Sequence, residues 1–309
     1  MKHPFPLNPT LTGIALAYQN EAFIADRVLP RVPVAGELYK WNEYTTEEKF
    51  TIPDTTAGRS GRVNEIEFTH QERESSVRDY GLEDPIPNAD IQAAAGSNFN
   101  PLGHATEMLT ELILLDREKR VADLVQNPAN YAAAYKEAPT TTDKWDHADS
   151  KPLEQLADAI EVPMARPNVL LLNGVSALAL RRNPSVVRAF NGSTGADGMV
   201  PLSFIRELLE IDEIIVGRGK HNAAKRGQEM SLAQLWGNHA LLIHRNPQAR
   251  PQGGITFGWT AQWGGRIAGD YEDRNIGLRG GRRVRVGESV DEKIVAADVA
   301  FLIQAVTTA

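Results

Sequence analysis

The sequence contains no cysteine, and this absence excludes several kinds of protein. Disulfide-stapled domains, thiolate zinc sites and cysteine nucleophiles all require that residue. The seven histidines are scattered, without the H-E-x-x-H spacing of a metal-binding helix. We therefore expect no metal, no cofactor and no disulfide. A cysteine-free chain also fits a reducing cytoplasm.

Long apolar runs are missing as well. No run reaches the about 18 residues needed to cross a bilayer, so no membrane partner is expected. The first residues, 1–6, lack the apolar segment of a signal peptide. The chain also has no G-x-x-x-x-G-K-[ST] loop and no G-x-G-x-x-G after a strand, the motifs that cradle phosphates.

The charge of this 309-residue chain is distributed unevenly. The net charge is −7, and residues 37–90 alone hold thirteen acidic and six basic side chains, so the remainder sums to zero. An acidic excess repels phosphate and argues against a dedicated nucleic-acid binder. The acidic segment is either a solvated face or a surface that meets basic patches on a neighbouring subunit. The hydrophobic fraction of 42% is enough for a core in one large or two modest domains.

The acidic segment has the pattern of a long hairpin. Leu38 and Val77 mark its two strands, and a polar stretch rich in Gly and Thr separates them. Because an isolated two-stranded hairpin is marginal in water, we expect this loop to lie on another copy of the chain. The residues predicted at that assembly interface are Trp41, Tyr44, Lys49, Phe50, Arg59 and Arg62.

The strongest helix signal follows the hairpin. Asn100 is a good N-cap residue, Pro101 suits the first turn, and apolar residues recur at helical spacing to about Gln126. A helix over 101–126 is about 39 Å long, which suits a support across a thin domain.

The second half of the sequence predicts a separate α/β block at about 165–265. Strands are expected at 169–172, 211–216 and 240–243, helices at 175–182 and 202–209, and a basic loop at 217–230. A further helix is expected at 152–161. The tail predicts two strands, 282–286 and 293–306, that pair back near the long helix.

Two local motifs suggest chemistry. The strand–Gly–Ser order at 172–178 resembles a nucleophile elbow, but Leu178 stands where a hydrolase needs glycine, which favours Ser176 as a first-turn helix residue. The Arg279-Gly280-Gly281-Arg282 stretch resembles a nucleic-acid RGG patch. It is short and bounded by strand-like residues, which favours a Gly-Gly turn that presents arginines to acidic partners.

The order of these parts resembles the major capsid proteins of tailed bacteriophages. The stretches that carry the resemblance are 20–30, 80–87, the helix at 101–126, 167–172, 211–217 and 231–244. The resemblance implies an α+β, Hong Kong 97-type capsid fold and covers nearly the whole chain. It divides the chain into an N-terminal arm (1–35), an extended β-hairpin loop (36–92), a peripheral domain with a long spine helix (93–160), an axial α/β domain (161–270) and C-terminal strands returning to the peripheral domain (271–309).

The resemblance also implies a function. It predicts a structural protein, not an enzyme, that forms pentamers and hexamers of an icosahedral shell around double-stranded DNA. The expected partners are further copies of itself, a portal, a separate scaffold protein, a decoration protein and the packaged DNA, bound without sequence specificity. The expected location is the virion capsid. Two alternatives stay open at this point: the shell of a cellular encapsulin-type nanocompartment, and an α/β hydrolase that uses Ser176.

Overall fold

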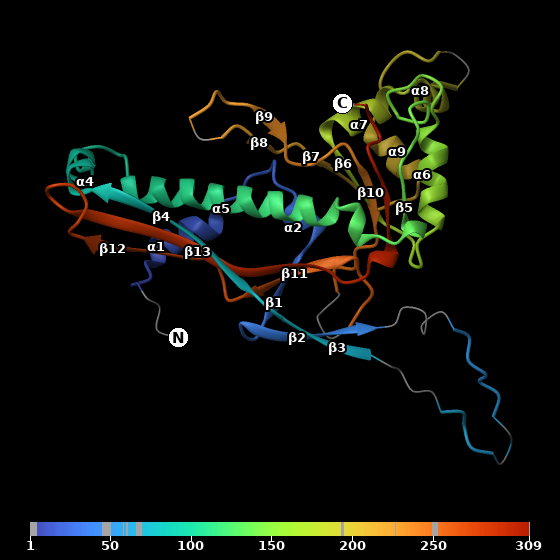
Figure 1. The fold of residues 1–309 in the computed structure, drawn as a ribbon, viewed down its shortest axis with the longest axis horizontal. Helices are drawn as coiled ribbons and strands as arrows, with labels where there is room; N and C mark the ends of the chain where they lie inside the picture. Colours follow the sequence, from blue (N-terminus) through green and yellow to red (C-terminus); the bar gives the residue numbers. More distant parts are fainter. Residues whose placement is uncertain are drawn as a thin grey trace.

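The computed structural model describes residues 5–44, 51–57, 59, 61–65, 70–192, 195–225, 227–248 and 253–308. Figure 1 shows an elongated molecule with one long helix, α5, running along it. A sheet lies along one side of α5, and a second α/β body stands at one end. A hairpin loop projects from the side of the sheet that faces away from α5.

The long sheet is built around its longest strand, β13 (Gly281–Ile294). Its order is β1 (Arg31–Val34), β11 (Gly258–Trp263), β13 and β12 (Ile267–Asp273), and β4 (Arg78–Pro87) also pairs with β13. The β4–β13 ladder is antiparallel and runs from Pro87 opposite Gly281 to Arg78 opposite Val290. The alternation of a strand places Val284 and Val286 on one face, where both are buried.

The helix α5 (Pro101–Val125) covers that buried face. Leu109 and Ile113 of α5 join Val284 and Val286 in one apolar cluster. The helix begins as the sequence predicts, since the side chain of Asn100 accepts a hydrogen bond from the Gly103 N–H. Two shorter helices complete this region, α1 (Pro9–Ala17) and α4 (Asn88–Ala94).

The second sheet has the order β5 (Lys136–Glu137), β14 (Ala300–Ile303), β10 (Ala240–Ile243), β6 (Val169–Asn173) and β7 (Glu213–Gly217). Both of its faces are covered: Leu171 belongs to one apolar cluster and Leu170 to another. The helices around it are α6 (Pro152–Glu161), α7 (Gly174–Arg182), α8 (Pro184–Asn191) and α9 (Leu202–Leu208). The predicted strands at 169–172 and 240–243 are therefore confirmed, whereas α8 was not predicted.

The predicted C-terminal strands need a correction. The first is longer than predicted and forms β13, and the second, predicted at 293–306, is the shorter β14 of the second sheet. β14 lies near the long helix, because Ala300 and Leu302 share an apolar cluster with Val121 and Val125 of α5. β14 lies between β10 and β5, and all four of its residues are buried, as expected for a strand with both faces covered. The strands β11 and β12 lie in the long sheet, although the sequence placed residues up to 270 in the axial domain.

The remaining elements are short. They are α2 (Ala25–Val28), the hairpin strands β2 (Leu38–Tyr44) and β3 (His70–Ser76), a second hairpin of β8 (Lys220–Asn222) and β9 (Leu232–Gln234), and 3-10 turns at Pro128–Asn130, Ala133–Tyr135 and Ala297–Val299. Among the described residues, no helix is both long and apolar enough to cross a membrane.

Candidate assembly interface

The extended loop is the most exposed part of the described chain. Its strands β2 and β3 pair antiparallel, from Leu38 opposite Ser76 to Tyr44 opposite His70. Beyond them the chain leaves the body of the molecule (Figure 1), and there Ile52 is 93% exposed. An apolar side chain in that position has nothing to pack on in its own chain, so it is available to a partner.

The six residues predicted at the interface fall in different places. Arg59 and Arg62 are exposed on the projecting part. Trp41 is buried against its own chain. Tyr44 ends β2, and its side chain is not among those described. Lys49 and Phe50 lie outside the described residues.

The base of the loop is supported within the chain. Tyr39 and Trp41 pack on Trp259 of β11, with ring centroids 5.8 and 6.4 Å from that of Trp259. The Tyr39 hydroxyl also donates to Asp291 at 2.6 Å. The expectation that the whole hairpin lacks support in its own chain is therefore wrong for its base. Sequence reasoning missed this contact because β11 lies far away along the chain.

Part of the acidic excess is neutralised inside the long sheet. Glu83 of β4 forms ion pairs with Arg285 and Arg283 of the neighbouring β13. Arg283 also pairs with Asp273 of β12 at 2.7 Å. The Arg-Gly-Gly stretch thus forms a turn and a strand whose arginines meet acidic side chains of the same chain. At the turn, Gly280 has a φ of 69°, a conformation that favours glycine.

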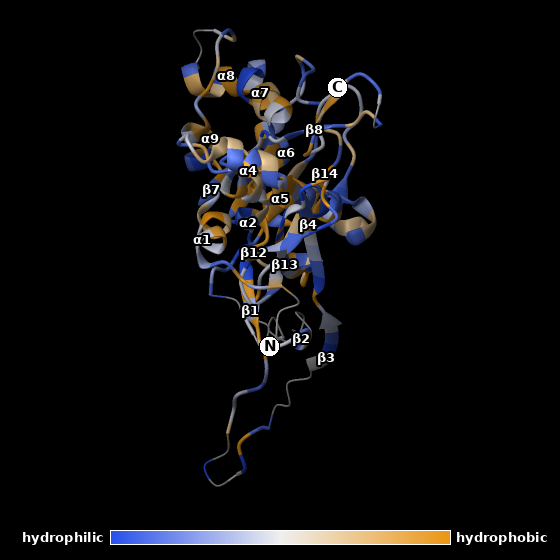
Figure 2. Cartoon of the chain, turned by 90° about the vertical axis from the view of Figure 1, so that its left-hand side faces the viewer, coloured by the Kyte–Doolittle hydropathy of each residue, from blue (hydrophilic) through white to orange (hydrophobic). Residues whose placement is uncertain are grey.

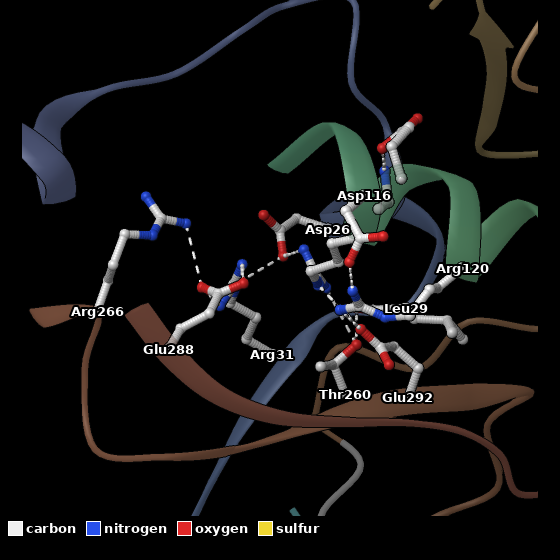
Figure 3. A network of polar contacts seen from close by, with 12 residues as sticks. Asp26, Leu29, Arg31, Asp116, Arg120, Thr260, Arg266, Glu288 and Glu292 are labelled. Carbon is white, nitrogen blue, oxygen red and sulfur yellow. Dashed lines mark hydrogen bonds and ion pairs between the residues drawn. The ribbon is translucent and has the colours of Figure 1, made fainter. Parts of the chain in front are cut away.

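A buried ionic network fastens the N-terminal arm to α5 and the long sheet (Figure 3). Arg117 of α5 is 1% exposed, donates to Asp26 of α2 at 2.7 Å and to the hydroxyl of Thr260 of β11 at 3.1 Å, and lies 3.7 Å from Glu292. Burial by itself would raise the pKa of Asp26, but the positive charges of Arg117 and Arg31 lower it overall.

The network continues along β13. Glu288 is buried and pairs with Arg31 of β1 at 2.9 Å and with Arg266 at 3.2 Å. Burial opposes ionisation of Glu288, but these two guanidinium groups lower its pKa overall. The ion pairs of this network join four guanidinium groups (Arg31, Arg117, Arg120 and Arg266) to four carboxylates (Asp26, Asp116, Glu288 and Glu292), so these charges balance.

A second polar anchor joins the arm to the axial body. The carboxylate of Glu118 accepts hydrogen bonds from the backbone N–H groups of Ile24 and Ala25, both at 2.8 Å, and from the indole of Trp236 at 2.7 Å. Burial raises the pKa of Glu118, although these hydrogen bonds act against the rise.

The sequence held a signal for Arg117, which continues the i+4 row of Leu109 and Ile113 on the buried stripe of α5.

The C-terminal segment depends on a neutral histidine. The N–H of Ala305 donates to Nδ1 of His239 at 3.0 Å, and Ala305 has a φ of 46°, which is strained for alanine. Nδ1 can accept this hydrogen bond only while it carries no proton. Burial lowers the pKa of His239, which keeps the ring neutral.

This geometry predicts a pH dependence. Because the pKa of His239 is lower in the folded than in the unfolded state, the unfolded chain binds more protons below pH about 6.5. The free energy of unfolding is therefore expected to fall as the pH drops from about 6.5 towards the lower folded-state pKa. Urea unfolding of the wild-type chain and of His239→Gln, whose amide oxygen still accepts, measures the difference. If the free energy of unfolding fell equally steeply with pH in both proteins, His239 would not be the group responsible for the pH dependence.

Ser176 has no access to a substrate in this structure. It lies in the first turn of α7, as the sequence favours, and its N–H donates to Asn173 at 2.7 Å. Its side chain is fully buried, and the hydroxyl has no hydrogen-bond partner among the described residues. The arrangement does not provide the exposed, base-activated serine that a hydrolase requires.

A long helix on a sheet, a projecting hairpin and a second α/β body together define a capsid-type fold. A phage-related protein from Bordetella bronchiseptica RB50 is similar, with a TM-score of 0.78 and 19% identity over 99% of both chains. The capsid of cyanophage P-SCSP1u gives a TM-score of 0.58 with 12% identity, covering 93% of this chain and 89% of that one. The fold is thus the Hong Kong 97-type capsid fold.

Curated relatives narrow the class to a family. The chain is 49% identical over 301 residues to the major capsid protein of Pseudomonas phage JBD67, covering 97% of both chains. It is 27% identical to the major capsid protein of Burkholderia phage BcepMu, covering 97% of this chain and 96% of the relative. No family model matches the sequence. The chain belongs to the phage major capsid proteins.

Proposed function

We propose that this major capsid protein forms pentamers and hexamers that tile an icosahedral shell around double-stranded DNA. The observation that carries the proposal is the loop beyond β2 and β3, whose described residues 51–57, 59 and 61–65 are all exposed, Ile52 and Val63 among them (Figure 1). A loop of one copy that binds a different surface of the next makes a head-to-tail contact, and such contacts form rings where the rotation between copies closes. Of the interface residues predicted from the sequence, Arg59 and Arg62 are exposed on this loop and belong to the proposed contact.

The charge distribution supports a shell that holds DNA without reading its sequence. Outside residues 37–90 the acidic and basic side chains balance, so the remaining surface neither grips nor strongly repels phosphate. We expect a portal, a scaffold protein and a decoration protein as further partners, and assembly in the host cytoplasm. The 49% identical relative is a phage protein, which favours this function over a cellular nanocompartment.

Electron microscopy and analytical ultracentrifugation of the expressed full-length chain test the proposal. We expect pentamers, hexamers or closed shells, with or without a co-expressed scaffold protein. A chain that stays a compact monomer at high concentration, with its loop protected from hydrogen exchange, would contradict shell formation. Particles that enclose a cellular enzyme in place of phage DNA would favour the nanocompartment.

A further inference from the structure

The hairpin of β8 and β9 has one covered and one uncovered face. The strands pair antiparallel with Lys220 opposite Gln234, His221 opposite Ala233 and Asn222 opposite Leu232. Because side chains alternate across a strand, Lys220, Asn222 and Leu232 share a face. Those three are exposed, whereas His221 and Ala233 on the other face are partly buried. An isolated two-stranded hairpin is marginal in water, so a contact on its uncovered face would stabilise it further.

The uncovered face combines apolar and basic groups. Leu232 is 58% exposed, and Met230, in the loop before β9, is 70% exposed. Residues 217–234 contain four basic side chains (Arg218, Lys220, Lys225 and Arg226) and one acidic side chain. Among the described residues, Lys220 and Lys225 form no ion pair. The surface that fits this face is therefore apolar with carboxylates at its edge.

The outer face of α5 has that composition. Met108 is 51% and Leu112 is 47% exposed, one helical turn apart, and the acidic Glu107 and Glu111 lie beside them. Glu111 is held in place by the Tyr18 hydroxyl at 2.5 Å and the Asn20 amide at 2.8 Å, and this contact raises the pKa of Tyr18 to about 12. Figures 1 and 2 show the hairpin on the side of α5 that faces away from β13.

We propose that the β8–β9 hairpin of one subunit docks on the outer face of α5 in a second copy of this chain. The contact pairs Leu232 with Met108 and Leu112, and it brings Lys220 close to Glu107. Both faces are uncovered in the single chain, and their charges are opposite. The two faces differ, so the contact is head-to-tail, the kind that forms a ring when the rotation between copies closes. The docking rests on the proposed function, since it adds a second contact within the same rings.

The absence of cysteine makes a crosslinking test clean. Chains with only Leu232→Cys are mixed with chains with only Leu112→Cys, assembled and oxidised. We expect disulfide-linked dimers on a non-reducing gel, and the double variant should give a ladder that ends at five or six chains. The matched control replaces Leu232→Cys by Leu278→Cys, a fully exposed residue in the turn between β12 and β13, and should give no ladder.

The outcomes separate the two proposals. If shells form without crosslinks, the docking is wrong but shell formation still holds. The same conclusion follows if the only disulfide forms within single chains of the double variant. Failure of the unsubstituted chain to form rings or shells contradicts shell formation itself. A charge reversal supplies an independent measurement: Lys220→Glu should reduce the assembled fraction, and adding Glu107→Lys should restore it. Loss without restoration would also count against the docking.

Discussion

Deleting residues 50–62 is expected to leave a folded chain that no longer forms particles. The deletion removes a part of the loop whose described residues are all exposed, and it spares the base, where Tyr39 and Trp41 lie on Trp259. The interfaces of stable assemblies bury on the order of 2,000–5,000 Å², and the deletion removes exposed surface that the proposed contact between copies uses. Particle yield by electron microscopy and the thermal unfolding midpoint by circular dichroism measure the two effects.

The matched control for the deletion keeps the loop at full length. A chain in which residues 51–57 have the same composition in shuffled order should fold equally well and assemble less efficiently than the wild-type chain. Full assembly of the deleted chain would contradict a role for the loop. A large fall in its unfolding midpoint would show that the loop contributes to the fold of the single chain.

Replacing Arg117 by alanine is expected to lower the free energy of unfolding by about 3 kcal/mol, the lower end of the range for one partner removed from a buried ion pair, because the side chain of its partner Asp26 is 55% exposed. Arg117 is fully buried, and its loss leaves the network around it with one carboxylate in excess. It also removes a contact between α5 and the N-terminal arm at Asp26. Urea unfolding measures the loss, and hydrogen exchange of residues 24–31 shows whether the arm detaches first.

Lys119→Ala is the control for this prediction. Lys119 lies on the same helix and pairs with Asp123 one turn away, but both side chains are well exposed. Such surface pairs contribute about 0.5 kcal/mol or less, so this substitution should change the stability little. Equal effects of the two substitutions would show that the buried network does not hold the arm.

The parts of the fold that follow from short-range patterns could be predicted from the sequence. The cap at Asn100 and the apolar stripe after it give α5, and the run at 169–172 gives β6. The position of β14 could not be predicted, because an apolar strand does not specify which of two sheets it joins. The contact between Trp41 and Trp259 could not be predicted for the same reason, because it depends on how distant segments of the chain pair.

The candidate site shows the same division. The sequence predicted Arg59 and Arg62 on an exposed part of the loop, because a mostly polar stretch with few apolar side chains has little to bury. It did not identify Arg117 and Glu118, whose partners come from the arm and from β13. Charged residues on the buried stripe of α5 indicate that buried partners exist, but the sequence does not reveal which residues these partners are.

The connection between β3 and β4 has a mechanical consequence. Only Val77 separates the two strands, and its N–H donates to Glu37 at the base of the loop. A pull on the loop is therefore transmitted along the axis of β4, whose ladder with β13 is ten residues long. Force in that direction strains all the hydrogen bonds of the ladder together instead of opening them one by one. In a shell linked by these loops, the outward pressure of the contents would load the β4–β13 ladder in shear. Breaking the ladder would then require all of its hydrogen bonds to fail together.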